Sequence, residues 1–179
     1  MDFFLKENNN FTPFTLQHAI VALFCICFGF ALIVITKKQT NKVQSIIGNV
    51  FAFSICFTVL LGTFVHLYKG NFNIQEDLPL HLCSFLALII PVLSVTKKFV
   101  YYEIFFFLIL AGTLQSLITP DEHNYLNFPF FRYWFVHAGL VVFMFFATFI
   151  YKMRPTLRSV GKSFLGMQAY MLFMFILNY

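Results

Sequence analysis

The sequence predicts an all-α fold, a polytopic transmembrane helical bundle with about six spanning helices in one integral membrane domain, residues 1–179. Three observations support this prediction. Hydrophobic residues make up 60% of the chain, and charged residues only 11%, against about a quarter in soluble domains. The hydrophobic residues also gather in runs of about 17 to 24 residues, close to the length that crosses a bilayer as a helix. Too few polar side chains remain to cover a water-facing surface.

Six apolar runs follow one another along the chain, separated by short polar connections. They span about residues 18–35, 45–68, 79–95, 99–118, 133–151 and 163–179. Each run is apolar all round, so none is an amphipathic surface helix. Backbone groups in lipid must bond internally, which favours helices, and the alternating pattern of a barrel is absent. The last run ends without flanking charges, so we expect a fragment lacking a seventh helix or an end at the outer interface.

Basic residues indicate the orientation of these helices. Nine of the twelve Lys and Arg residues lie in the first, third and fifth connections: Lys37, Lys38, Lys42, Lys97, Lys98, Lys152, Arg154, Arg158 and Lys162. This bias predicts that these connections are cytoplasmic and that the N-terminus of a cell-membrane protein is non-cytoplasmic. The net charge of +5 comes from short clusters between apolar runs, so we expect no nucleic-acid partner.

Polar residues within apolar segments are costly, and here they gather on the predicted outer side. All five histidines fall there: His18, His66, His81, His123 and His137. Measured from the expected segment starts, Cys83 and His137 share a depth of about 6 Å. Gln115 and His66 lie near the outer ends of their segments. Because buried polar groups seek partners, we expect a shared polar pocket in the outer leaflet.

Cys83 is the candidate nucleophile of this pocket, with His137 as its base on a neighbouring helix. A thiol becomes a reactive thiolate only when a base lies nearby. Cys25, Cys27 and Cys56 have no polar sequence neighbours, so we interpret them as small hydrophobic residues.

Five residues are candidates for supporting or substrate-binding roles. Gln115 offers a donor to an oxyanion, or a bond between helices. Arg132 is suited to an aromatic-belt anchor or to binding a lipid phosphate. Asp121 either orients a histidine or forms a turn. His81 lies about 200° around a helix from Cys83, so we expect it to face a different groove. His66 is either an interfacial residue or part of the pocket.

Three stretches, Leu78–Phe85, Ala111–Asp121 and Phe131–Val142, resemble the YwaF-type bacterial integral membrane proteins. These proteins are related to the animal transmembrane protein 164, which is described as a cysteine acyltransferase acting on phospholipids. The resemblance implies that Cys83 is the nucleophile, that His137 is its partner histidine and that membrane phospholipids supply an acyl-lipid substrate. Family members also continue past the last residue here, which favours the fragment interpretation.

Two other hypotheses stay open. A non-catalytic protein would use the same polar layer to pack helices or to bind a lipid. A metal or haem site would draw on His66, His81 and His137, although no HxxxH pair places two ligands on one helix face. We therefore expect no metal and no cofactor.

Overall fold

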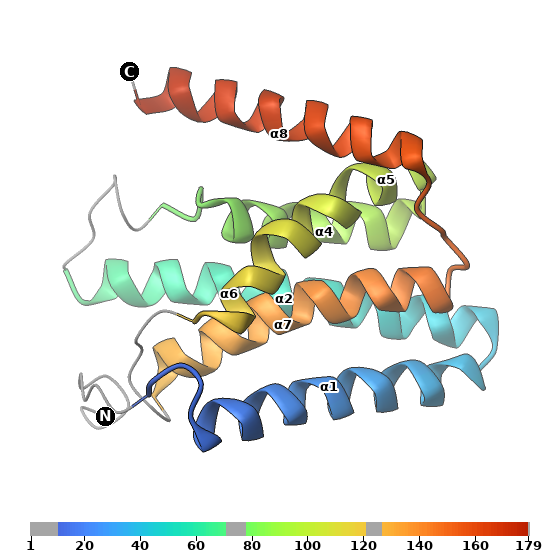
Figure 1. Ribbon diagram of the computed structural model, residues 1–179, viewed down its shortest axis with the longest axis horizontal. Coiled ribbons are helices and arrows are strands. Elements are labelled where there is room, and N and C mark those ends of the chain that lie inside the picture. Colours follow the sequence, from blue (N-terminus) through green and yellow to red (C-terminus); the bar gives the residue numbers. More distant parts are fainter. Residues whose placement is uncertain (1–10, 71–77, 121–126, 179) are drawn as a thin grey trace.

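The regular structure of this protein is helical throughout the described residues, 11–70, 78–120 and 127–178 of a computed structural model. The elements, in order, are α1 (Leu16–Lys37), α2 (Asn41–Tyr68), α4 (Leu82–Thr96), α5 (Phe99–Leu108), the π-helical turn η2 (Ile109–Thr113), α6 (Leu114–Ile118), α7 (Phe128–Phe149) and α8 (Leu157–Asn178). The elements α5, η2 and α6 follow one another without a break and form one continuous rod. With α1, α2, α4, α7 and α8, the described residues therefore form six helical rods (Figure 1). The predicted all-α class is confirmed.

Five of the six rods are apolar and long enough to cross a membrane. The third, α4, has 15 residues, or about 22 Å of helix against a hydrocarbon core of about 30 Å. The expected start at residue 79 is wrong, because Leu80 N–H bonds back to Leu78 C=O in a turn and His81 has extended backbone as the N-cap. The start of α4 is therefore recessed relative to the ends of α2 and α7 (Figure 1).

Capping residues set the starts of α1 and α7, which lie earlier than the apolar runs suggested. Thr15 accepts a hydrogen bond from the His18 N–H, and Asn127 accepts one from the Phe130 N–H at 3.0 Å. Each cap satisfies a backbone donor that has no partner in the first turn. At the end of α4, Lys97 has a left-handed backbone (φ 51°), which allows a tight connection to α5.

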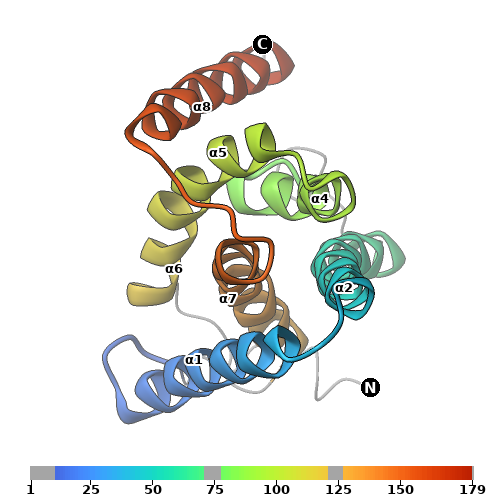
Figure 2. The same ribbon diagram turned by 90° about the vertical axis from the view of Figure 1, so that its right-hand side faces the viewer.

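Helix α7 is the centre of the bundle. Viewed end-on, it is surrounded by α1, α2, α4 and α6, while α8 lies outermost against α5 (Figure 2). The close approach of α2 and α7 depends on Gly139, because a Cβ there would lie 3.0 Å from the Ile55 side chain. Small residues at such contacts bring membrane helices together. The fully buried core includes Ile55, Val59, Leu86, Ile90, Leu140, Phe143 and Met144.

The two ends of the bundle differ in charge. The basic end, where α1, α4 and α7 finish, carries the nine Lys and Arg residues of the three basic connections. The opposite end, where α4 and α7 begin, carries Cys83 and is called the site end below. Up-and-down connections place every basic connection on one side, as the sequence pattern predicts.

Candidate functional site

A cavity of about 430 Å³ opens at the site end between α2, α4, α6 and α7. Its lining consists of Val59, His81, Leu82, Cys83, Ser84, Ser116, Pro129, Arg132, Tyr133, Val136 and His137. Four of the predicted site residues therefore meet here, namely Cys83, His137, His81 and Arg132. They come from two stretches of chain about fifty residues apart, joined by the packing of α4 against α7.

Cys83 is the second residue of α4. The apolar run suggested instead that it lies more than one helical turn inside its segment. The first-turn N–H groups of a helix have no partner within the helix and carry partial positive charge. The Cys83 thiol lies 3.7 Å from the hydroxyl of Thr113 and also contacts the Ser116 side chain. Thr113 is the last residue of the π-helical turn, a distortion often found at functional sites. Two hydroxyl groups thus lie beside the thiol.

His137 is held in a defined orientation by its own helix. Its Nδ1 lies 2.8 Å from the backbone oxygen of Tyr133, and since a carbonyl can only accept, Nδ1 donates. In the neutral ring, Nε2 is then the basic nitrogen. The rings of Tyr133 and His137 lie 4.2 Å apart, and the Tyr133 hydroxyl donates to Ser116 C=O at 2.6 Å. Nε2 is therefore the ring nitrogen whose chemistry suits proton transfer.

His81 lines the same cavity as Cys83, so the expectation that they face different grooves is wrong. The 200° separation assumed that both residues lie in the helix. His81 instead precedes α4 as its N-cap with φ −54° and ψ 143°, and the helical periodicity does not apply to it. Counted from the helix starts, Cys83 is the second residue of α4 and His137 the tenth residue of α7. Because the start of α4 is recessed, both side chains nevertheless reach the same cavity.

A smaller cavity of about 90 Å³ adjoins the first and is lined by Thr63, His66, Leu78, Pro79, His81, Ser84 and Arg132. The two cavities share His81, Ser84 and Arg132. Arg132 reaches α2 because Gly62 has no side chain: a Cβ there would lie 2.5 Å from the arginine Nε. The predicted residue His66 therefore joins the site through this second cavity, beside a guanidinium.

One predicted residue, Gln115, lines neither cavity. Gln115 is exposed, and its neighbour Ser116 faces the cavity in its place. Because the run is apolar on all sides, the sequence does not indicate which face of this helix points toward the bundle. The spacing of three residues between Thr113 and Ser116 is a weak signal, because it places both on one face. Asp121 lies outside the described residues.

Tyr170 is a contributor that the sequence did not signal. Its hydroxyl donates to Leu80 C=O at 2.7 Å, just before the start of α4. Its ring also packs on Phe85, with centroids 5.3 Å apart. Helix α8 thus supports the turn that carries His81 and Cys83, through a contact ninety residues away in sequence.

The histidine-based metal hypothesis and the position of His18 can be compared with the geometry. Among the described residues, no group of three His, Cys, Asp or Glu side chains is arranged to hold a metal ion, so the geometry does not support the metal hypothesis. His18, outside the cavity, bonds on both ring nitrogens: Nε2 with Leu117 C=O at 2.9 Å and Nδ1 with Phe14 N–H at 3.0 Å. It ties α1 to α6, which is a packing role.

Comparison with known families matches residues 13–179 to the TMEM164 family. The chain belongs to this family. With its long apolar helices, membership makes the chain a multi-pass integral membrane protein. The finer YwaF-type assignment stays a prediction. Searches of curated proteins and of solved structures gave no match.

Proposed function

We propose that this protein transfers acyl groups between membrane lipids through a thioester on Cys83, with His137 as the general base. The observation that supports it most is the single cavity within an apolar bundle that Cys83 and His137 both line. Such a cavity suits a substrate whose ester lies at the membrane interface. Polar side chains within spanning segments cost free energy, so their presence around one cavity supports a functional role for it.

In the first step, Nε2 of His137 takes the thiol proton as the Cys83 sulfur attacks the ester carbonyl of a phospholipid. The C–S bond forms and the ester C–O bond breaks. The departing lysolipid oxygen takes the proton back from His137 and leaves as an alcohol. In the second step His137 deprotonates the hydroxyl of an acceptor lipid, which attacks the thioester and releases the Cys83 thiol. The two steps balance without a further reactant.

The oxyanion that forms in both steps requires hydrogen-bond donors. Gln115 was the expected donor, but it is exposed. We assign the role instead to the N–H groups in the first turn of α4, which have no partner within the helix, assisted by Thr113 and Ser116 near the sulfur. These donors are fixed by the helix, so they need no rearrangement during the reaction.

Arg132 is the proposed phosphate-binding residue. Its guanidinium borders both cavities, and a guanidinium binds phosphate through two parallel hydrogen bonds. A phosphate in the smaller cavity would place the ester of the same lipid in the larger one.

The basic bias leads us to propose further that the site lies in the outer leaflet of the cell membrane, with the N-terminus non-cytoplasmic. Single cysteines at Lys38 and Arg154 should then react with an impermeant reagent only from the cytoplasm. Cysteines at Thr12 and Lys69 should react only from outside. The reverse pattern would move the site to the inner leaflet.

The test of the activity uses purified protein in vesicles with a phospholipid labelled in its acyl chain and an unlabelled lysophospholipid. We expect the label to appear in the newly acylated lipid. Cys83→Ala should abolish this transfer, whereas Cys56→Ala, a half-buried thiol on α2, should retain it. Transfer that survives Cys83→Ala overturns the mechanism, and a folded wild type without transfer favours a lipid-binding role.

A further inference from the structure

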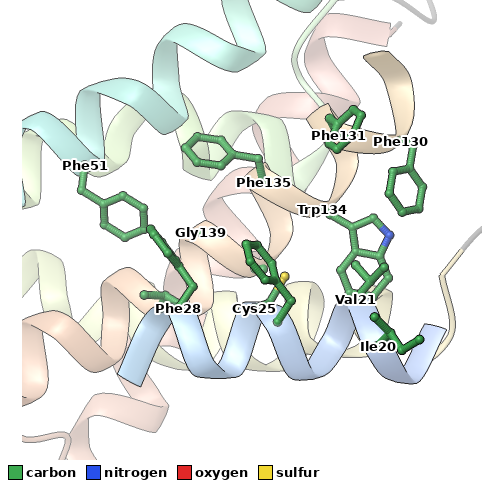
Figure 3. Close-up of a pocket in the computed structure, with 13 residues that line it drawn as sticks. Ile20, Val21, Cys25, Phe28, Phe51, Phe130, Phe131, Trp134, Phe135 and Gly139 are labelled. Atoms are coloured by element: carbon green, nitrogen blue, oxygen red, sulfur yellow. The ribbon is translucent and has the colours of Figure 1, made fainter. Parts of the chain in front are cut away.

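Tyr133 differs from the other aromatic residues near the start of α7. Four of these neighbours line a separate apolar groove between α1, α2 and α7 (Figure 3), namely Phe130, Phe131, Trp134 and Phe135. Tyr133 lines the Cys83 cavity instead. It precedes His137 by four residues, about one helical turn, so both side chains lie on the same face of α7. The side chain of Tyr133 therefore belongs to the surroundings of the proposed base.

The phenol ring of Tyr133 packs against the imidazole of His137. Their ring centroids are 4.2 Å apart and their planes are inclined by 34°, a separation shorter than the about 4.5–7 Å that is usual for aromatic pairs. The Tyr133 backbone contacts the same imidazole, because its C=O accepts the bond from Nδ1 at 2.8 Å. The ring and the carbonyl of one residue together restrict the rotation of the imidazole.

The hydroxyl of Tyr133 fixes its ring in turn. It donates to Ser116 C=O at 2.6 Å and so joins α7 to α6. The side chain of Ser116 contacts the Cys83 thiol. Tyr133 is thus bonded to the backbone beside the thiol at one end and packed on the histidine along its ring. The position of the base relative to the thiol depends on these two contacts.

We propose that Tyr133 is a positioning residue for the acyl transfer, and that its ring stabilises the imidazolium form of His137. This inference rests on the proposed function, in which the S–H bond of Cys83 breaks and an N–H bond forms at Nε2 of His137. The imidazole is neutral before this step and a cation after it. A cation within about 6 Å of an aromatic ring centroid is attracted to the face of the ring. Because this attraction grows as the proton arrives, it lowers the barrier to the proton transfer.

The rate at which a lipophilic electrophile modifies Cys83 measures this contribution, with mass spectrometry to follow all four cysteines. Tyr133→Leu removes the ring and should slow the reaction about tenfold. Tyr133→Phe keeps the ring and loses only the bond to Ser116 C=O, so it should slow the reaction by no more than about threefold. Phe131→Leu is the matched control on the same helix. It should react like the wild type, because Phe131 lines the separate groove (Figure 3).

A double-mutant cycle separates this role from a general effect on packing. In a His137→Ala background, Tyr133→Leu should cause no further slowing, because the ring acts through the imidazole. An unchanged rate at Cys56, a half-buried thiol on α2, verifies in the same samples that the bundle is intact.

Three results overturn the inference while the proposed function stands. In the first, Tyr133→Leu slows the reaction equally with and without His137. In the second, Tyr133→Phe is as slow as Tyr133→Leu, so that the ring contributes nothing. In the third, His137→Ala slows the modification of Cys83 but Tyr133→Leu does not. If His137→Ala itself leaves the rate unchanged, the proposed base is wrong and the inference falls with it.

Discussion

At the basic end, the buried side chains of Glu103 and Ser94 bond to partners on other helices, whereas at the site end Cys83 and His137 line a cavity of about 430 Å³. The Glu103 carboxylate pairs with Lys162 and accepts from the Ser159 hydroxyl at 3.1 Å. The Ser94 hydroxyl donates to the Asn49 side chain at 2.8 Å. These bonds join α5 to α8 and α4 to α2, far from the candidate site.

The difference separates two uses of polar residues in a membrane protein. A hydrogen bond between two helices satisfies both groups and fixes their packing. A group that lines a cavity is within reach of a ligand that enters it. If this comparison is right, substitutions at the site end change the reactivity of Cys83 with little effect on stability. Substitutions at the basic end should lower the stability of the protein with little effect on the reactivity of Cys83.

The largest expected effect is that of His137→Ala. Since a positioned base contributes about a hundredfold or more to such reactions, a lipophilic electrophile should modify Cys83 at least about a hundredfold more slowly in this variant. Mass spectrometry of labelled protein measures this rate for all four cysteines. In the wild type, Cys83 should react faster than Cys25, Cys27 and Cys56. If the rate at Cys83 equals theirs and is indifferent to His137, the site end has no nucleophile.

Ser116→Ala should have the next largest effect, since Ser116 contacts the thiol. Loss of this polar neighbour of the sulfur should slow modification of Cys83 by up to about tenfold. Gln115→Ala is the matched control and should leave the rate unchanged, because Gln115 points away from the cavity. A larger effect of Gln115→Ala than of Ser116→Ala would assign the contribution to Gln115 and not to Ser116.

Tyr170→Phe should have a smaller effect. It keeps the ring contact with Phe85 but removes the hydrogen bond to Leu80 C=O, a loss of about 1 kcal/mol. We expect modification of Cys83 to slow by about fivefold or less, through the position of the α4 start. Tyr101→Phe, on α5, is the control and should match the wild type. No change in Tyr170→Phe would mean that α8 does not support the site.

Ser94→Ala should have the smallest effect on reactivity and a clear effect on stability. Ser94 is fully buried, and its replacement leaves the Asn49 oxygen without this donor. We expect a loss of about 1 kcal/mol in the free energy of unfolding, with modification of Cys83 unchanged. Ser54→Ala, whose hydroxyl bonds only within α2, should be near neutral. A slower Cys83 in Ser94→Ala would contradict the separation of the two ends.

Much of the candidate site was accessible from the sequence, but only as residue types at rough depths. Cys83 and His137 stood out because polar groups are rare in apolar runs, and both line the cavity. His81 was expected to face a different groove from Cys83. It shares the cavity because the turn at Leu78–Leu80 places it before the helix and not within it. Ser116 was overlooked in favour of Gln115, which is longer and more polar but lies on the other face.

The sequence by itself determined the helical class, the approximate helix ranges and the gathering of basic residues at one end. These properties are local: hydrophobicity over about twenty residues places a segment in lipid, and an unhydrated backbone must then form a helix. The tertiary structure decided which face of each helix looks inward, how far α4 is recessed and that Tyr170 supports its start. Runs that are apolar all round carry no periodic signal of facing, so that information exists only in the contacts between helices distant in sequence.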